Sequence, residues 1–132
     1  MCVFCKIIKG EIPSFKIYET EDLVAFLDIS QATKGHSLIV PKKHYENLLA
    51  LDEEMLMKIS VAQKEVAKIL SKKLGTNAFN FVNNCGSIAG QSVMHVHFHV
   101  IPRYENDDFK MHIVEHEPNF EELAKLHKQI TE

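Results

Sequence analysis

Five short segments of the chain alternate apolar and polar residues or are almost wholly apolar, and turn-forming residues bound each of them. Such segments are typical of β-strands. The pattern predicts strands at residues 16–19, 23–28, 35–41, 78–82 and 93–103. Pro41 closes the third segment, which fits the end of a strand because proline cannot donate a ladder hydrogen bond.

A longer segment follows a helical repeat instead. Its apolar residues recur at spacings of three and four from Leu56 to Leu70, which places them on one face of a helix. Asp52 is a typical N-cap, and Gly75 suits the position after the last turn. We therefore expect a helix over about residues 53–74.

The order of the elements predicts an α+β fold. A helical turn within residues 1–11 precedes the strands, and a short helix over 120–130, capped by Asn119, follows them. Short connections between strands favour an antiparallel sheet. We expect one domain over 1–132: a five-stranded antiparallel sheet with one long helix packed on it and a short C-terminal helix. The other sheet face stays open for a ligand.

Composition narrows the classes of partner. The 132 residues carry a net charge of −3, with 45% hydrophobic and 25% charged residues, which is typical of a globular domain. No basic region is available for nucleic acid, so we expect no such partner. The chain has no apolar run long enough for a membrane span and no signal peptide in its first residues. We therefore expect no membrane partner and a cytoplasmic protein.

The last predicted strand carries three histidines that alternate with apolar residues. Successive side chains of a strand point to opposite faces, so we expect the apolar residues to face the core and the histidines to share the open face. The apolar residues are Met94, Val96, Phe98 and Val100, and the histidines are His95, His97 and His99. Three imidazoles on one face indicate chemistry, because exposed imidazoles add little to packing.

Phosphate chemistry is the first interpretation of the triplet. Imidazole can attack phosphorus and form a covalent phosphoramidate, which divides one displacement into two steps. His97, in the middle of the row, can have a second imidazole on either side to hold phosphate oxygens or pass a proton. The preceding loop, residues 84–92, contains two glycines and short polar side chains, and its N–H groups can turn toward an anion.

Two other features leave alternatives open at this point. Cys2 and Cys5 have the spacing of zinc ligands, but free thiols or a redox pair fit the same spacing. Five histidines distant in sequence are candidates for the remaining metal ligands: His36, His44, His95, His97 and His99. Asp28, at the end of a predicted strand, suits either a turn or a carboxylate that binds a ribose diol.

The residues His95-Val96-His97-Phe98-His99-Val100-Ile101 resemble the signature of the histidine triad (HIT) superfamily. Further segments resemble the same family: an opening segment at 4–13, nucleoside-binding strands at 26–30 and 35–44, and a pre-triad loop at 90–93. The resemblance covers about residues 2–104 and leaves a tail over 105–132. It is strongest for the Hint-like branch, including zinc-bearing bacterial Hit proteins.

This resemblance implies hydrolysis of nucleoside phosphoramidates, or of related bonds such as those of dinucleoside polyphosphates, through a nucleotidyl-histidine intermediate. By resemblance His97 is the nucleophile, His99 contacts the phosphate and the leaving group, and His36 stands behind the nucleophile. Ser92 joins them as a catalytic residue. His99 stands where transferase relatives carry glutamine, which favours hydrolysis over transfer to a sugar phosphate.

The resemblance also implies a site for a purine nucleotide. Asp28 is expected to contact the ribose hydroxyls, with Phe26 and Ile29 around the base. The phosphate side is expected to consist of loop residues together with two of the histidines. These are Asn84, Gly90, Gln91, Ser92, Val93, His97 and His99.

Zinc and a second copy of the chain are implied in the same way. The zinc-bearing relatives imply a metal site formed by Cys2, Cys5, His44 and His95. With four protein ligands the zinc is structural and does not activate water, but it fixes the strand that carries His97. The family fold is a half-barrel whose two copies join their sheets, so we expect a homodimer.

Two other functions fit the same residues. In a zinc hydrolase the triad histidines would hold a metal-bound water, which predicts an open coordination position. In a nucleotide-binding adaptor hydrolysis would be residual, and protein partners would carry the function.

Overall fold

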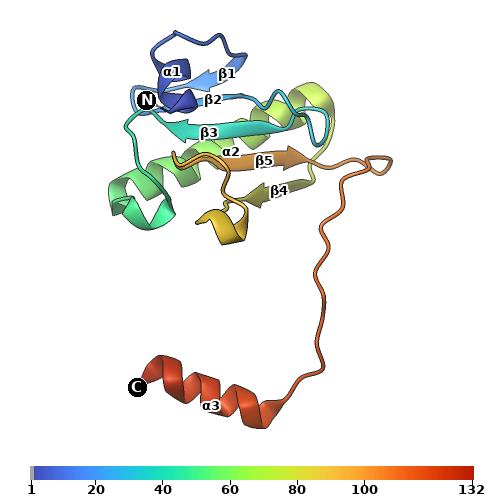
Figure 1. The fold of residues 1–132 in the computed structure, drawn as a ribbon. Helices are drawn as coiled ribbons and strands as arrows, with labels where there is room; N and C mark the ends of the chain where they lie inside the picture. Colours follow the sequence, from blue (N-terminus) through green and yellow to red (C-terminus); the bar gives the residue numbers. More distant parts are fainter. Residues whose placement is uncertain (1) are drawn as a thin grey trace.

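The computed structural model describes residues 2–132 and is built on one antiparallel sheet (Figure 1). The spatial strand order is β1-β2-β3-β5-β4, and every neighbouring pair is antiparallel. The strands are β1 Lys16–Glu19, β2 Leu23–Leu27, β3 Ser37–Pro41, β4 Phe79–Val82 and β5 Phe98–Pro102. The predicted α+β fold with a five-stranded antiparallel sheet is confirmed, and β1 and β4 form its two edges.

The long helix α2, Glu53–Leu74, covers one face of the sheet (Figure 1). The side chain of Asp52 accepts a hydrogen bond from the Met55 N–H at 2.8 Å, and Gly75 has φ 75° after the last turn. Both helix ends therefore lie where the capping residues predict them. The core between helix and sheet includes Ile59, Ala62, Val66, Ile39 and Val100.

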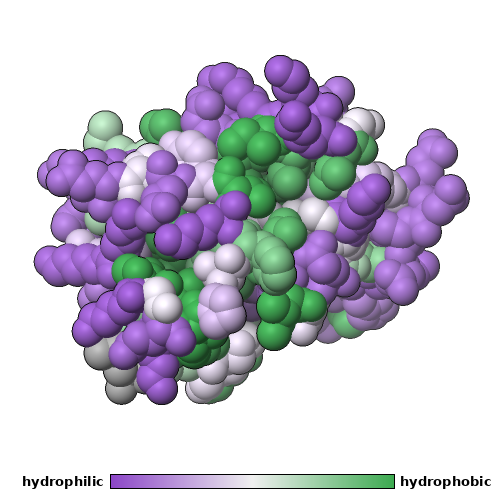
Figure 2. All heavy atoms as spheres, turned by 90° about the horizontal axis from the view of Figure 1, so that it is seen from above, coloured by the Kyte–Doolittle hydropathy of each residue, from purple (hydrophilic) through white to green (hydrophobic). Residues whose placement is uncertain are grey.

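The opposite face of the sheet is only partly open. The helix α1, Val3–Ile8, lies on it and buries Phe4 and Ile7 in a second, smaller core. From this end of the molecule, apolar residues gather in the middle of an otherwise hydrophilic surface (Figure 2). Two short 3-10 helices, Leu48–Ala50 and Ser87–Ala89, lie in connections where the apolar pattern predicts no element.

The last strand is shorter than predicted. β5 begins at Phe98, and residues 93–97 approach it through bends. Val96 and Phe98 are buried in the core as expected, but Met94 is 39% exposed, so the prediction for Met94 was wrong. The Val96 N–H donates to the Tyr45 carbonyl at 2.8 Å. The backbone here is therefore held by a loop rather than by a neighbouring strand.

After β5 the chain leaves the sheet. Residues 110–119 contain no helix or strand, and α3, Phe120–Thr131, stands clear of the sheet (Figure 1). The predicted cap of this helix is present, since Asn119 Oδ1 accepts from the Glu122 N–H at 3.1 Å. Within residues 2–132 no helix combines the length and the apolar character that crossing a membrane requires.

Candidate active site and metal site

His97 is held from several sides. Its Nδ1–H donates to the backbone carbonyl of His95 at 2.8 Å, and its ring meets Phe4 edge-on, with 5.0 Å between the centroids. The Asn83 side chain donates to the His97 carbonyl at 3.0 Å. A neutral imidazole has one N–H, so the proton on Nδ1 leaves the lone pair on Nε2. Imidazole acts as a nucleophile in this form.

His36 and His99 form a hydrogen-bonded pair whose direction is set by the backbone. The Ala32 N–H donates to His36 Nδ1 at 3.1 Å, so neutral His36 carries its proton on Nε2. This N–H donates to His99 Nδ1 at 2.9 Å, which leaves the proton of His99 on Nε2. His97 therefore offers a lone pair and His99 an N–H donor, and both residues line the same pocket.

Burial keeps this pair neutral. Burial, with smaller effects from His97 and His36, lowers the pKa of His99 to about 4. Burial also lowers the pKa of His36, although the Asp28 carboxylate, 3.6 Å from its Nε2, acts in the opposite direction. Both imidazoles are neutral at pH 7, as the direction of their hydrogen bonds requires.

The pocket lined by His97 and His99 has a volume of about 530 Å³, which suits a small-molecule ligand. Its walls are mainly apolar and include Phe4, Ile7, Ile12, Phe15, Phe26 and Ile29. Asp28 is the acidic residue of the lining. One of its carboxylate oxygens accepts from the Ser30 N–H at 2.8 Å. This bond fixes the carboxylate, and the second oxygen can accept from a ligand.

The loop residues expected on the phosphate side fall into two groups. Ser92 and Val93 line the pocket, whereas Asn84, Gly90 and Gln91 lie outside its lining. The buried side-chain amide of Gln91 uses its oxygen and its nitrogen on three backbone groups, at 2.7 to 3.0 Å. Gln91 therefore shapes the loop that carries Ser92, and its amide is already engaged in the protein.

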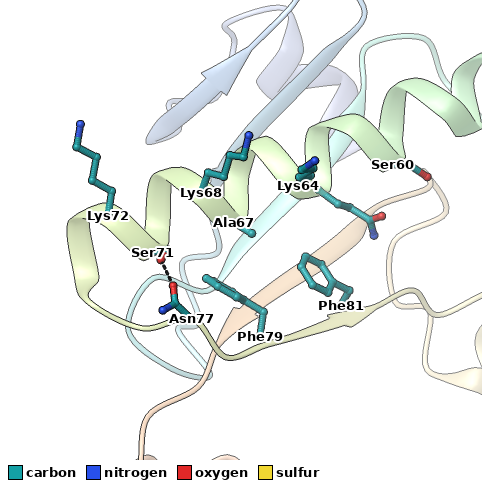
Figure 3. Close-up of a pocket in the computed structure, with 10 residues that line it drawn as sticks. Ser60, Lys64, Ala67, Lys68, Ser71, Lys72, Asn77, Phe79 and Phe81 are labelled. Carbon is teal, nitrogen blue, oxygen red and sulfur yellow. Dashed lines mark hydrogen bonds between the residues drawn. The ribbon is translucent and has the colours of Figure 1, made fainter.

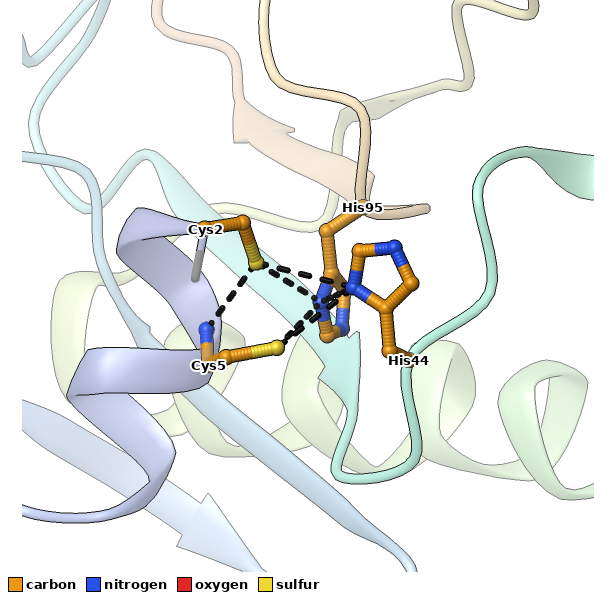
Figure 4. A group of neighbouring side chains, drawn as sticks. All are labelled: Cys2, Cys5, His44 and His95. Atoms are coloured by element: carbon orange, nitrogen blue, oxygen red, sulfur yellow. Dashed lines mark hydrogen bonds between the residues drawn. The ribbon is translucent and has the colours of Figure 1, made fainter.

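Four side chains outside the pocket converge on one point (Figure 4): Cys2, Cys5, His44 and His95. The sulfur atoms lie 3.3 to 3.6 Å from the two Nδ1 atoms, which are themselves 3.1 Å apart. A tetrahedral zinc with bonds of about 2.3 Å to sulfur and 2.0 Å to nitrogen separates its ligand atoms by roughly 3.3 to 3.8 Å. The donor set and its spacing therefore fit zinc.

His95 connects the metal cluster with the pocket. Its Nε2–H donates to the Pro41 carbonyl at 2.8 Å, so the Nδ1 lone pair points into the cluster. Its own carbonyl accepts the Nδ1–H of His97. Burial lowers the pKa of His95, although its bond to Pro41 acts against this, and the neutral form is the one that binds metal.

A second group of possible ligands behaves differently. Asp28, His36 and His99 also offer donor atoms close to one another. However, the bond between the two rings needs a proton on His36 Nε2, where a metal would need a lone pair. This geometry favours a proton-carrying pair over an open catalytic metal centre.

A model of the HIT domain matches residues 9–106, which include the pocket strands and the histidine triplet. The chain belongs to the HIT domain family. The resemblance predicted from the sequence is thereby confirmed, and the HIT domain covers the sheet, α2 and the triplet but not α3.

Relatives of this HIT protein extend over almost the whole chain. Adenosine 5'-monophosphoramidase HNT1 of Saccharomyces cerevisiae is 44% identical over 130 residues, which cover 98% of this chain and 80% of the yeast protein. The crystal structure of SMU.412c from Streptococcus mutans matches with a TM-score of 0.92 and 44% identity, over 98% of this chain and 82% of that one. A Zn-bound histidine triad family protein from Mycobacterium smegmatis matches with a TM-score of 0.79 and 32% identity, over 97% and 96%.

Two contacts of this HIT site were not predicted from the sequence. The pattern shows Phe4 to be apolar but not that its ring meets His97. Nothing in the sequence indicates that the Asn83 amide holds the His97 carbonyl. The position of Asn83 next to the pre-triad loop does not single it out, because Asn84 lies there as well.

Proposed function

We propose that this HIT protein hydrolyses nucleoside phosphoramidates, or related nucleotide phosphate bonds such as those of dinucleoside polyphosphates, through a covalent nucleotidyl-His97 intermediate. The observation that carries the proposal is the pairing of a free Nε2 lone pair on His97 with an Nε2–H donor on His99 in one pocket. The phosphoramidase activity named for the yeast relative supports the class of substrate.

In the first step His97 Nε2 attacks phosphorus, a P–N bond to the enzyme forms and the bond to the leaving amine breaks. The amine takes one proton from solvent through the Nε2–H of His99. In the second step water attacks phosphorus, the bond to His97 breaks and one proton returns to solvent. The His95 carbonyl stabilises the positive charge on the modified ring, because it accepts the Nδ1–H of His97.

The nucleoside is assigned to the rest of the pocket. The free oxygen of Asp28 can accept from a ribose hydroxyl, since its other oxygen is held by the Ser30 N–H. The apolar side chains of Phe26 and Ile29 line the same pocket and suit a purine base. Ser92 also lines it and can donate its hydroxyl to a phosphate oxygen.

We further propose a structural zinc bound by Cys2, Cys5, His44 and His95. The fit of the four donor atoms and the zinc in the mycobacterial relative support this assignment. Burial and the neighbouring Cys2 raise the pKa of the Cys5 thiol, so a bound cation is what would hold the Cys5 sulfur as a thiolate. Zinc would supply rigidity here, because the four side chains would leave no coordination position for water.

A homodimer through β4 completes the proposal. β4 pairs with β5 on one side only, and Phe81, on this strand, is 47% exposed. A groove between β4 and α2 contains the Phe79 and Phe81 rings next to Ala67, below a row of lysines (Figure 3). An open strand edge with apolar side chains is a typical surface for pairing with another copy.

The test of the hydrolase is His97→Ala assayed with adenosine 5'-phosphoramidate. We expect turnover to fall at least about a thousandfold, or roughly 4 kcal/mol of barrier, and a nucleotidyl adduct to be detectable by mass spectrometry in the wild type alone. Lys73→Ala, an exposed change on α2, serves as the control. Undiminished turnover in His97→Ala would refute the mechanism. Tight binding of adenosine monophosphate without turnover by the wild type would favour the adaptor.

A further inference from the structure

The residues that follow β5, 103–109, are fixed to the domain and form the root of the C-terminal segment. The guanidinium of Arg103 binds both carboxylate oxygens of Asp107 at 2.9 and 3.0 Å and donates to Asn80 of β4 at 2.7 Å. It also donates to the Phe109 carbonyl and stacks on that ring at 4.9 Å. The direction in which the chain leaves the domain is therefore set by the protein, next to the β4 edge.

Beyond this root lies an arm, residues 110–132, that its own domain does not cover. Every residue from 110 to 132 is exposed. The exposed apolar residues of the arm are Met111, Ile113, Val114, Phe120, Leu123, Leu126 and Ile130. On α3 the last four fall on one side at helical spacing, the opposite side carries Glu121, Lys125 and Lys128, and Glu122 lies at the border. An apolar helix face of this kind is stable in water only when something covers it.

The S. mutans relative shows that the arm has a defined place. Residues 110–132 are 23 of the 132 residues, so an alignment that covers 98% of the chain extends over most of them. The observed score is 0.92 over 98% of the chain. Much of the arm therefore occupies the same position in that crystal structure. A helix without contacts to its own domain keeps one position when another molecule holds it.

We propose that the arms are exchanged between two copies of this chain, with the apolar face of α3 packed on the second copy. The proposal rests on the pairing through β4 put forward above. Ten extended residues reach about 33 Å and the twelve-residue α3 spans about 18 Å, enough to cross a neighbouring domain. Because Arg103 ties the root to Asn80 on β4, an arm that leaves this edge passes directly onto a copy paired there.

The charges of the arm argue against a lipid surface as the occupant. Helices that lie in a membrane interface are rich in lysine and arginine on their polar side. Here the polar side of α3 carries two glutamates and two lysines, and residues 108–119 hold three acidic residues and one lysine. Such an arm is not attracted to anionic lipid. A second copy of the chain, by contrast, is present wherever the arm itself is present.

The test uses the photo-crosslinking substitution Leu123→p-benzoylphenylalanine in the full chain, with the same substitution at Lys125, on the polar side, as the matched control. Unlabelled variant is equilibrated with 15N-labelled wild type, irradiated, and analysed by mass spectrometry of crosslinked peptides. We expect crosslinks from position 123 to labelled peptides, at least about fivefold more than from position 125. Light scattering on the same samples gives the oligomeric state.

The outcomes separate the two proposals. A dimer whose crosslinks all lie within one copy, or that shows none, overturns arm exchange and leaves pairing through β4 intact. A monomer without crosslinks between copies overturns both. As a second measurement, the double variant Leu123→Glu and Ile130→Glu is expected to raise the dimer dissociation constant at least tenfold, with Glu122→Gln as control. An unchanged constant in the double variant contradicts the proposal.

Discussion

The side chain and the backbone of His95 belong to different parts of the site. The imidazole offers its Nδ1 to the cluster with Cys2 and Cys5, and the carbonyl of the same residue accepts the Nδ1–H of His97. A shift of the ring moves the carbonyl as well, since both are attached to one Cα. The three histidines, equivalent in the sequence pattern, therefore differ in their contacts: His95 turns its Nδ1 to the cluster, His97 keeps a free Nε2 lone pair, and His99 keeps an Nε2–H.

The bond between His36 and His99 gives the first prediction. In His36→Ala the His99 Nδ1 loses its donor, so His99 can place its proton on Nδ1 and present no N–H to the leaving group. We expect kcat for adenosine 5'-phosphoramidate to fall about 10²-fold, with KM changed less than threefold. His36→Asn keeps an N–H donor and should recover part of kcat. Equal kcat values in His36→Ala and the wild type would show that the pair has no part in proton transfer.

The low pKa of His99 predicts a loss of stability in acid. An unfolded histidine has a pKa near 6.5, whereas burial lowers the pKa of His99 to about 4 in the fold, so the unfolded state binds more protons between these values. The contribution of neutral His99 is complete above pH 6.5 and is lost as the pH falls toward 4. We expect the free energy of unfolding to decrease by about 1 to 3 kcal/mol more in the wild type than in His99→Gln over this range.

Denaturant unfolding at pH 7, 6, 5 and 4.5 measures this difference. Both proteins lose stability in acid through other groups, so the comparison is between their slopes against pH. Parallel curves for the wild type and His99→Gln would contradict a strongly lowered pKa at this position.

At the scale of elements, the sequence predicted some boundaries well and others poorly, for identifiable reasons. The ends of α2 are set by local signals, the Asp52 cap and Gly75, and they were predicted correctly. The start of β5 depends on long-range contacts. Alternation extends back to residue 93, but His95 turns toward residues over 50 positions away and the Val96 N–H binds Tyr45. Periodicity cannot reveal such contacts.

The position of α1 predicts how the protein responds to loss of metal. Cys2 caps this helix and Cys5 lies within it, so zinc would join α1 to His44 and His95, and α1 carries Phe4 against His97. We expect Cys5→Ser to lose about one equivalent of zinc by elemental analysis and to lower Tm by at least about 5 °C. Chelation of the wild type should lower Tm similarly.

Cys85 provides the matched control, because it is a free cysteine outside the cluster. Cys85→Ser should keep both the zinc and the Tm of the wild type. If Cys5→Ser retained full zinc content, the assignment of the four ligands would be wrong. Protein prepared without zinc should also show faster proteolysis near residue 10, as α1 detaches from the sheet.

At the scale of the whole molecule, the candidate site combines residues from distant parts of the chain. The pocket combines α1, the end of β2, the pre-triad loop and β5. The histidine triplet and the Cys2–Cys5 pair were singled out from the sequence by residue type and spacing, whereas the roles of His36 and Ser92 were implied by the family resemblance. The directions of the hydrogen bonds at these residues could not be predicted from the sequence, because Ala32 and His36 control the proton of His99 from 63 or more positions away. Tertiary structure alone decides which nitrogen carries each proton.

The two edges of the sheet differ in a way that predicts where a second copy binds. The register of β1 against β2 shifts between Lys16 and Tyr18, and this edge carries the Lys16–Glu19 ion pair; both features oppose edge-to-edge pairing. The β4 edge is regular over its whole length against β5 and exposes Phe81. Pairing two copies there would extend the sheet and cover the groove beside α2.

We therefore expect Phe81→Asp to disrupt the proposed dimer, because pairing through β4 would bury the new carboxylate of each copy in an apolar interface. Sedimentation equilibrium between 1 and 100 μM, a range that brackets a dissociation constant of about 10⁻⁵ M, measures the change. Leu49→Asp replaces an equally apolar, 83% exposed residue of a 3-10 helix away from this edge and should leave the dimer intact.

Because the arm starts beside β4, Phe81→Asp should also abolish crosslinks from position 123. Crosslinks that persist in a Phe81→Asp dimer would place the contact between the copies on the arm instead of on the strand edge.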